Sequence, residues 1–518
     1  MILTCEEMRA VEEEAFARGV EAEALMEEAG RRIAAAVRQF FPVAATCQVV
    51  YGKGNNGGDA LVAARHLAEM GWRIRIEAAY PPAAWSPLLD KKFEELTPLL
   101  ELNPPHDELP LAVILDGLLG TGASTGPLRE PLRGAVERID QLRESSGASV
   151  FAIDLPTGLD SETGAPGEVT VTADVTLAIG HAKTCLLADA ALPHVGRLAV
   201  LPLSGLEITP GRFRPLESVA TPQHLARFHR PRSFNLHKGD CGRVGIVAGS
   251  PGMTGAAVMA AHAAVRGGAG LVTLFVSPDA AQRIVPQLMP EVMMATLEDF
   301  NRLRDHSLDV LGIGPGLGPL AGTPKGEVLA DLLATFPGTV VADADALNLL
   351  AADGQARRSV LSRRAGPRLL TPHPGEMARL FPPSSDLDRR ETAAAFLAHP
   401  EVLGPPGAPP LALLLKGART LVAEHPDAAH LHLSWNTTGN PGMATGGMGD
   451  ILTGLTAALA AQGHPPFDAA RIGAWIAGRA AELTVAQGWR SHESLSATDL
   501  LEFFGPAFHL LKSDGQGY

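Results

Sequence analysis

Short apolar stretches that end in glycine-rich or polar loops recur along this chain. The first is the stretch 47–51, CQVVY, which precedes the loop 52–59, GKGNNGGD, and a helical segment at 60–71. Similar stretches lie at 111–122, 149–160 and 173–183. Alternation of buried strands with helices is typical of parallel sheets that carry helices on both faces. The chain is therefore predicted to be an α/β protein whose ligands gather where the strands end.

The chain is expected to form two domains. A second series of strands and helices begins at 241–250, CGRVGIVAGS. Between the two series, residues 203–235 are rich in proline and show no sustained periodicity, which indicates a connection with at most one short helix. A chain of 518 residues is also too long for one hydrophobic core. We expect a Rossmann-like three-layer domain at 1–210, a linker at 211–232 and a second α/β domain at 233–518.

Charge and cysteine content limit the partners and the compartment. The formal net charge is −14, whereas nucleic acids and anionic membranes attract basic surfaces, so neither is an expected partner. The four cysteines, Cys5, Cys47, Cys185 and Cys241, are scattered without metal-binding spacing, which indicates a reducing compartment. The acidic N-terminus does not resemble a signal peptide, and no apolar run approaches the ~18–20 residues of a membrane helix. The expected location is the cytoplasm.

A glycine-rich segment directly precedes an apolar helix in the stretch 436–461, NTTGNPGMATGGMGDILTGLTAALAA. Glycines leave backbone N–H groups accessible, and a helix N-terminus carries about half a positive charge. The stretch is therefore predicted to bind an anion such as a phosphate group. The carboxylate of Asp450 at this position could take a proton from a hydroxyl group that becomes a nucleophile. The alternative is that Asp450 only caps the helix.

Amide and acidic side chains follow three strands of the first half. The loop 52–57 matches GxGxxG between a strand and a helix, which is typical of dinucleotide-binding folds. Asn55 and Asn56 in this loop favour contacts with a polar ligand or a cation. Asp116 and Asp154 end two further strands, where a carboxylate can move protons or bind a cation. The alternative for each aspartate is a helix cap or a turn residue.

Several of these motifs resemble those of one known family. NNGGD at 55–59, DGLLGTG at 116–122 and IDLPTGLD at 153–160 resemble the YjeF N-terminal family of NAD(P)H-hydrate epimerases. In the second half, HKGDCGRVGIVAGS, GIGPGLG, DADALN, TPHPGE, LKGARTLV and NTTGNPGMATGGMGD resemble the ATP/ADP-dependent NAD(P)H-hydrate dehydratases, which have a ribokinase-like α/β fold. The order of the motifs matches the fused bacterial repair enzymes, and the resemblance covers nearly the whole chain outside the linker.

For the first domain, the resemblance implies an epimerase, an isomerase that interconverts the R and S hydrates of NADH and NADPH. Asp154 would contact the hydrate and act as acid and base at the epimerised carbon. A potassium ion would be bound by oxygen atoms of Asn56, Asp116 and Thr157. Two segments would also contact the hydrate, namely Asn55, Asn56, Gly57, Gly58 and Asp59, and Gly120, Thr121, Gly122, Ala123, Ser124, Thr125 and Gly126.

The chain departs from the usual family pattern in three places. Ala60 replaces the glycine that commonly follows NNGGD, and Thr157 replaces a serine. The segment Gly117, Leu118 and Leu119 replaces a commoner alanine–phenylalanine pair. A threonine hydroxyl can still bind potassium, so the expected ion site is retained. Ala60 is expected to tighten the start of the helix, and the third change alters an apolar wall.

For the second domain, the resemblance implies a dehydratase, a lyase that acts on the S hydrates, called NADHX and NADPHX, and consumes ADP or ATP. The hydroxyl group would receive a phosphoryl group and leave as phosphate, with Asp450 as the base. The hydrate would lie near Ala256, Gly316, His373 and Asp450. The nucleotide would bind to Lys416, Gly417, Ala418, Arg419, Thr420 and Gly449, with magnesium bridging its phosphates. A homo-oligomer is expected because relatives form larger assemblies.

The residues themselves support part of this assignment. Lys416 ends the apolar stretch LALLL, where its ammonium group can meet a phosphate. His373 lies between two prolines, which favours a fixed hydrogen-bonding role over a free histidine in a surface loop. An alternative function is a ribokinase-like vitamin kinase fused to a non-catalytic binding domain. That alternative shares Asp450 but leaves NNGGD and Asp154 without a role.

Overall fold

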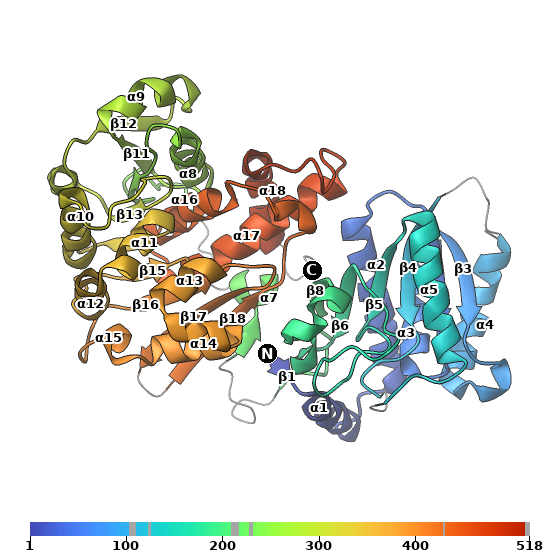
Figure 1. The fold of residues 1–518 in the computed structure, drawn as a ribbon. Coiled ribbons are helices and arrows are strands. Elements are labelled where there is room, and N and C mark those ends of the chain that lie inside the picture. Colours follow the sequence, from blue (N-terminus) through green and yellow to red (C-terminus); the bar gives the residue numbers. More distant parts are fainter. Residues whose placement is uncertain (103–109, 123–125, 209–216, 227–231, 428–429, 513–518) are drawn as a thin grey trace. The chain divides into compact units, whose positions relative to one another are not determined.

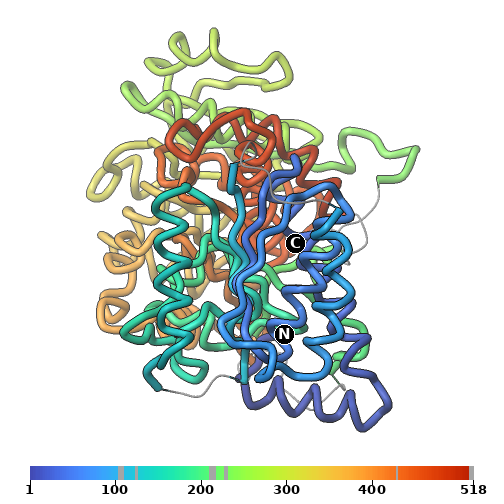
Figure 2. The backbone as a smooth tube through the Cα atoms, turned by 90° about the vertical axis from the view of Figure 1, so that its right-hand side faces the viewer, coloured from blue at the N-terminus to red at the C-terminus, as the bar shows by residue number. Residues whose placement is uncertain are grey.

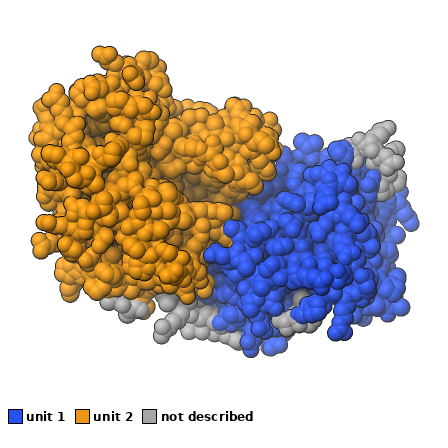
Figure 3. All heavy atoms as spheres, in the orientation of Figure 1, with its two compact units in different colours: residues 1–215, 518 blue, residues 216–517 orange. Residues whose placement is uncertain are grey.

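The computed structural model describes residues 1–102, 110–122, 126–208, 217–226, 232–427 and 430–512. The chain divides into two compact units, residues 1–215 and 216–517 (Figure 3). Each unit is built on its own sheet with helices packed against it (Figure 1).

The first unit contains a six-stranded sheet in which every neighbouring pair is parallel. In spatial order the strands are β3 (Arg73–Ala78), β2 (Thr46–Tyr51), β4 (Leu111–Gly117), β5 (Ser149–Ile153), β6 (Val175–Ile179) and β8 (Arg197–Leu201). Both faces of the sheet are buried, since Val49 of β2 packs in one core and Val50 in another. Burial on both faces explains why the central strands β4 and β5 consist mostly of consecutive apolar residues.

Helices cover both faces of this sheet, so the first unit has three layers (Figure 2). Helices α2 (Ala22–Phe40), α3 (Asn55–Glu69) and α4 (Pro87–Leu102) share one core, and α5 (Leu132–Ser146) packs on the other side. This unit also contains β1 (Ile2–Leu3), α1 (Cys5–Ala17), β7 (Ala182–Lys183) and α6 (Leu192–Val195). The pairing of β1 with β7 attaches the N-terminus beside the segment that follows β6.

The second unit contains a ten-stranded sheet. In spatial order the strands are β12 (Val292–Thr296), β11 (Leu271–Val276), β10 (Arg243–Val247), β13 (Val310–Ile313), β14 (Thr339–Ala342), β15 (Arg368–Leu370), β16 (Leu411–Leu415), β17 (Thr420–Asp427), β18 (His430–Asn436) and β9 (Glu217–Val219). Neighbours are parallel except for β17, which is antiparallel to both β16 and β18. The chain order reverses direction between β10 and β13, a position where open α/β sheets commonly bind ligands.

Helices also cover both faces of the second sheet. One core contains α8 (Thr254–Arg266), α16 (Met448–Ala461), α17 (Pro466–Ala486) and α18 (Leu500–Lys512). From β10 the chain adds β11 and β12 in one direction across the sheet, whereas from β13 it adds β14, β15 and β16 in the opposite direction. Because such connections are right-handed, the helices between β13 and β16 lie on the opposite face of the sheet from α8. These helices are α10 (Pro324–Thr335), α11 (Ala344–Ala352), α12 (Gly354–Ser362), α13 (Pro374–Leu380), α14 (Arg389–Leu397) and α15 (Pro400–Leu403), while α9 (Pro278–Ile284) precedes β12.

Small residues let α16 lie close to its neighbours. A Cβ atom at Gly454 would lie 2.0 Å from the backbone oxygen of Ala260 in α8, so a side chain is excluded at this contact. Helix α16 also packs on β13 and β14. Its N-terminus is thereby fixed near the ends of these two strands.

Part of the expected linker belongs to the second unit. Within 211–232, residues Glu217–Val219 form β9, which pairs with β18, and Pro222–Ala226 form the short helix α7. The α/β class predicted from the alternation of strands and helices is confirmed in both units. Within the described ranges, no helix has the length and apolar character needed to cross a membrane.

Candidate active sites

The first candidate site lies where three adjacent strands of the first unit end. Strands β2, β4 and β5 are neighbours, so the loops that follow them meet at one edge of the sheet. A Cβ atom at Gly120 would lie 3.1 Å from Asp154 Oδ2 and 3.3 Å from Asn56 Oδ1. The structure therefore places Asn56, Gly120 and Asp154 side by side.

Asp116 and Thr157 form a buried group of oxygen atoms beside this edge. The hydroxyl and the backbone N–H of Thr157 donate to the two oxygens of Asp116 at 2.8 and 2.9 Å. Asp116 has no exposed surface (0%), and burial raises its pKa to about 6 although hydrogen bonds from Thr157 and Leu118 oppose this shift. A nearby cation would favour the ionised form of such a carboxylate.

Asn56, the third expected potassium ligand, has a buried polar atom to which no described residue makes a hydrogen bond. The side-chain nitrogen of Asn56 is buried and has no hydrogen-bond partner in the described part of the chain. Among the described residues, no group of three or more His, Cys, Asp or Glu side chains is placed to bind a metal ion. A cation held by Asn56, Asp116 and Thr157 would therefore be coordinated by one carboxylate together with amide and hydroxyl oxygens.

Asp154 is held in an uncommon backbone conformation. Its φ is 70°, in the left-handed region that non-glycine residues rarely adopt. Its Oδ1 accepts hydrogen bonds from the Ile179 N–H at 3.2 Å and from the ammonium group of Lys183, and its Oδ2 accepts one from the Thr121 N–H at 3.1 Å. Strained residues of this kind cluster at functional sites.

The other predicted contacts of the hydrate differ in exposure. Asp59 is half-buried, and its pKa lies well above the usual value because of burial and of the carboxylates of Asp154 and Glu12. Three predicted residues are exposed, namely Asn55, Gly122 and Gly126. Three more lie outside the described residues, namely Ala123, Ser124 and Thr125.

Gly57 and Gly58 have a packing role. A Cβ atom at Gly57 would lie 2.4 Å from the backbone oxygen of Gly52, and one at Gly58 would lie 2.4 Å from Cε of Met26. Both residues are buried. They allow the start of α3 to lie close to the preceding loop and to α2.

Two of the departures from the family pattern contact each other. A Cβ atom at Gly117 would lie 2.5 Å from the Cβ atom of Ala60. The methyl group of Ala60 thus fills the space that a side chain at Gly117 would need. The third departure, Thr157, keeps its hydroxyl on Asp116, as described above.

The second candidate site lies at the N-terminus of α16. Gly447, with a φ of 93°, is the N-cap residue, and Asp450 is the third residue of the helix, so the helix-cap alternative for Asp450 does not hold. Asp450 is half-buried. Burial raises its pKa to about 6, and the carboxylate of Asp343 contributes to this increase, whereas the ammonium group of Lys416 opposes it.

Lys416 is held between two carboxylates beside this helix end. Its Nζ lies 2.6 Å from Asp343 Oδ1 and 3.7 Å from Glu376 Oε2. The other oxygen of Asp343 accepts a hydrogen bond from the Thr453 hydroxyl of α16 at 3.0 Å. A Cβ atom at Gly449 would lie 3.4 Å from both Lys416 Nζ and Asp343 Oδ2. The first turn of α16 thus lies next to the ion pair.

His373 has the fixed hydrogen-bonding role that its two flanking prolines favour. Its Nδ1 accepts hydrogen bonds from the backbone N–H groups of Gly375 at 3.0 Å and Glu376 at 3.3 Å. The backbone N–H of His373 donates in turn to Glu376 Oε2 at 2.8 Å. Because Nδ1 accepts, Nε2 carries the proton in the neutral ring, and it lies 3.4 Å from Glu376 Oε1.

The remaining predicted residues fall in two groups. Ala256 and Gly316 meet beyond β10 and β13, since a Cβ atom at Gly316 would lie 3.2 Å from that of Ala256. In the loop after β16, Gly417 and Ala418 are exposed and Arg419 is buried. The Thr420 hydroxyl donates to the backbone oxygen of Gly417 at 3.2 Å and closes this loop.

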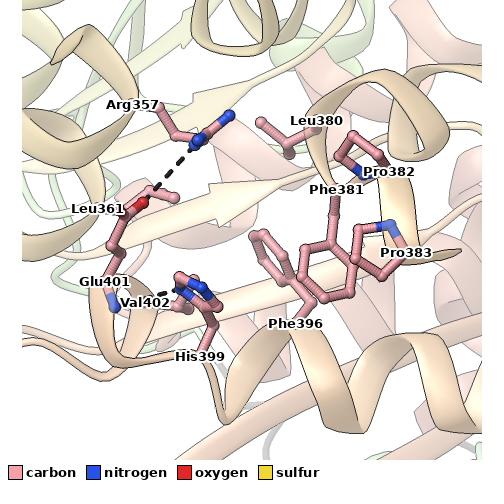
Figure 4. Close-up of a pocket in the computed structure, with 10 residues that line it drawn as sticks. All are labelled: Arg357, Leu361, Leu380, Phe381, Pro382, Pro383, Phe396, His399, Glu401 and Val402. Carbon is pink, nitrogen blue, oxygen red and sulfur yellow. Dashed lines mark hydrogen bonds and ion pairs between the residues drawn. The ribbon is translucent and has the colours of Figure 1, made fainter. Parts of the chain in front are cut away.

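A separate cavity of about 200 Å³ lies at the end of α13 (Figure 4). An ion pair spans part of its wall, with 3.6 Å between Arg357 Nε and Glu401 Oε2. Its lining consists of Arg357, Leu361, Leu380, Phe381, Pro382, Pro383, Phe396, His399, Glu401 and Val402. None of the predicted site residues is among them.

Charged residues outside the sequence-predicted set also contact these sites. They include Lys183, Asp343 and Glu376. Each carried a signal, because Asp343 and Glu376 lie inside the motifs DADALN and TPHPGE and Lys183 ends an apolar stretch. Lys183 is 29 residues from Asp154, and Asp343 is 73 residues from Lys416, so the pairing depends on the fold.

Comparisons with known proteins match both units. The family model described as YjeF-related protein N-terminus matches residues 22–185, and the model described as NAD(P)H-hydrate dehydratase matches residues 244–503. A crystal structure of the ADP/ATP-dependent NAD(P)H-hydrate dehydratase from Bacillus subtilis, co-crystallised with ATP/Mg²⁺, is 26% identical and covers 57% of this chain and 98% of that chain, with a TM-score of 0.46.

Relatives of known name match this chain over most of its length. The chain is 35% identical to the bifunctional NAD(P)H-hydrate repair enzyme of Moorella thermoacetica, over 92% of this chain and 91% of that protein. It is 34% identical to the Escherichia coli protein of the same name, over 92% of this chain and 87% of that protein. With relatives of this identity along nearly its whole length, the chain belongs to the family of bifunctional NAD(P)H-hydrate repair enzymes.

Proposed function

We propose that the first unit interconverts the R and S hydrates of NADH and NADPH, and that the second unit dehydrates the S hydrate at the expense of ADP or ATP. Membership of the family supports the assignment of one activity to each unit. The observation that carries the proposal is the cluster at the start of α16, where the carboxylate of Asp450, the ammonium group of Lys416 and a helix N-terminus meet.

In the second unit, Asp450 takes the proton from the hydroxyl group of the hydrate, whose oxygen attacks the terminal phosphorus of the nucleotide. The bond from that phosphorus to the bridging oxygen breaks, so AMP leaves from ADP, or ADP from ATP. Backbone N–H groups at the start of α16 and the Lys416 ammonium group stabilise charge on the phosphoryl group. The lone pair of the ring nitrogen then expels phosphate, and loss of a proton from the adjacent carbon restores NAD(P)H.

The environment of Asp450 supports its role as the base. A pKa of about 6 leaves most of the side chain ionised at neutral pH while making it more basic than an ordinary carboxylate. The residues proposed to bind the nucleotide are Lys416, Gly417, Ala418, Arg419, Thr420 and Gly449, and those proposed to contact the hydrate are Ala256, Gly316 and His373. Magnesium would neutralise part of the phosphate charge and be held chiefly by the nucleotide.

In the first unit, Asp154 is the proposed acid and base at the epimerised carbon. Its Oδ2 lies next to Gly120 and Asn56, at the edge where the hydrate is expected. The proposed potassium ligands are Asn56, Asp116 and Thr157, and the buried carboxylate of Asp116 supports a cation at this place. Potassium would supply positive charge and fix the loops that contact the hydrate.

The proposed location is the cytoplasm, which the four buried free cysteines support. We also propose that the protein forms a homo-oligomer, which the resemblance to the repair-enzyme family supports.

The proposal is tested by incubating the protein with an equal mixture of the R and S hydrates, magnesium, potassium and either ADP or ATP. Complete recovery of the reduced-nicotinamide absorbance is expected, because the first unit supplies S hydrate as the second consumes it. Recovery that stops at half would mean that the first unit is inert. No recovery, with a phosphorylated vitamin formed instead when candidate vitamins are supplied, would refute the proposal in favour of a vitamin kinase.

A further inference from the structure

A buried lysine contacts the proposed catalytic group of the first unit. Lys183 is 1% exposed, and its ammonium group donates to Asp154 Oδ1 and to the backbone oxygen of Ile179, the latter at 2.7 Å. The lysine is held in place by the short parallel pair β1–β7, in which Leu3 lies opposite Lys183. An ammonium group buried so completely is strongly destabilising unless it is paired.

The surroundings of this ion pair are mostly acidic. The carboxyl groups of Asp59 in α3 and Glu12 in α1 face Asp154, and the pKa of each is raised, first by burial and then by repulsion from Asp154. The thiols of Cys5 and Cys185 lie 3.9 Å apart beside Lys183 and interact with it electrostatically. Among these neighbours, the lysine brings positive charge directly to Asp154 by hydrogen bonding.

The two oxygens of Asp154 have different hydrogen-bond partners. Oδ1 is occupied by Lys183 and by the Ile179 N–H. Oδ2 accepts from the Thr121 N–H and lies beside Gly120, in the loop that is expected to contact the hydrate. Lys183 therefore determines which oxygen of the carboxylate is available at the site.

We propose that Lys183 is a positioning residue for epimerisation, which fixes Asp154 Oδ1 by a charged hydrogen bond so that Oδ2 is the oxygen that exchanges protons with the hydrate. This proposal rests on the epimerase function proposed above. Lys183 acts through Asp154 and need not touch the substrate.

The test compares Lys183→Met with Lys92→Met in the full-length protein. Lys92 is a matched control, because it is a buried lysine of the same unit, 2% exposed, that pairs with Glu23, Glu27 and Glu95 rather than with Asp154. Epimerisation is followed without nucleotide by chromatographic separation of the R and S hydrates, starting from the R hydrate. The kcat and KM of epimerisation are measured at neutral pH after circular dichroism has shown that each variant is folded.

Loss of the ammonium group releases Asp154 Oδ1, so the carboxylate is free to turn away from the hydrate. The kcat of Lys183→Met for epimerisation is therefore expected to fall by about 100-fold. Its KM is expected to stay nearly unchanged, because Lys183 need not touch the substrate. Lys92→Met is expected to keep the wild-type kcat and KM, and dehydration of the S hydrate with ADP is expected to be unchanged in both variants.

A folded Lys183→Met variant with the wild-type kcat would overturn the proposal. If Lys183→Met does not fold, Lys183→Gln takes its place and the same outcomes apply. Lys183→Arg keeps a charged donor and is expected to recover most of kcat, so an Arg variant as slow as the neutral variant would also overturn the proposal. Failure of the underlying function is recognised separately, because the wild-type protein would then not convert the R hydrate at all.

Discussion

Replacement of Asp450 by alanine is expected to abolish dehydration and yet to stabilise the second unit at neutral pH. In the folded protein, burial and then Asp343 raise the pKa of Asp450 from 3.8 to about 6. A difference of roughly two pH units corresponds to about 3 kcal/mol in the free energy of unfolding. This is an upper value, because the side chain is half-buried and partly screened by water.

The raised pKa of Asp450 determines how this residue affects the stability of the folded protein at each pH. A raised pKa means that protonation of Asp450 favours the folded state, so this stabilisation is fully present below pH 3.8 and is lost as the pH rises through about 6. At neutral pH the ionised carboxylate is therefore a source of instability, which the alanine variant removes. At about pH 4, where the folded-state carboxyl is protonated, the variant should show little of this gain.

A helix-capping role for Asp450 predicts the opposite, since loss of a cap lowers stability by about 0.5–2 kcal/mol. Asp499 of the same unit provides the control. Although burial opposes the change, hydrogen bonds from the hydroxyl and N–H of Ser496, at 2.7 and 2.9 Å, lower the pKa of Asp499. Asp499→Ala should therefore destabilise the protein at neutral pH, by an amount that shrinks as the pH falls.

Urea unfolding at neutral pH and at about pH 4 measures these effects, with tryptophan fluorescence as the signal. Trp435 and Trp475 are buried in the second unit and report on its unfolding. The reasoning predicts a more stable Asp450→Ala variant and a less stable Asp499→Ala variant at neutral pH. It is refuted if Asp450→Ala is less stable than the wild type there, or if its effect does not depend on pH.

Three further predictions concern packing, the cation and charge. Gly117→Ala should destabilise the first unit by about 1–3 kcal/mol because of overpacking against Ala60, and the double change Gly117→Ala/Ala60→Gly should recover most of this loss in urea unfolding; independent effects would contradict the contact. Asp116→Asn should remove the potassium dependence of epimerisation, measured by replacing potassium with a large organic cation, and a retained dependence would place the ion elsewhere. Asp343→Asn should move the acid limb of dehydration to lower pH, because the carboxylate that raises the pKa of Asp450 is gone; an unchanged limb in the pH–rate profile would exclude this coupling.

The sequence predicted the class of fold and the position of the loops for a simple physical reason. Strands buried on both faces, such as β5 and β16, consist mostly of consecutive apolar residues that can be recognised without a structure. Polar residues that follow such strands must meet at one edge of a parallel sheet. Asn56, Gly120 and Asp154 therefore come together at the position where their loops were expected to converge.

Contacts between distant segments could not be read from local patterns. The ion pair of Lys183 with Asp154 depends on the pairing of β1 with β7, and the strand β1 is only two residues long. β9 lies in a proline-rich stretch without periodicity, and it becomes a strand because β18 offers an open edge. The charge neighbours of Asp450 come from the ends of β14 and β16, which only the sheet order places beside α16.

The central claim is that Asp450 is the base that ionises the hydroxyl group of the hydrate for phosphoryl transfer. The most direct measurement is the rate of ADP-dependent dehydration of pure S hydrate against pH, for the wild type and for Asp450→Asn, with nucleotide binding measured in parallel. The account predicts a wild-type rate that falls below a pH of about 6, and an Asn variant that binds ADP but does not turn over. Turnover by the Asn variant at the wild-type rate, or a wild-type rate that is constant through this pH range, would contradict it.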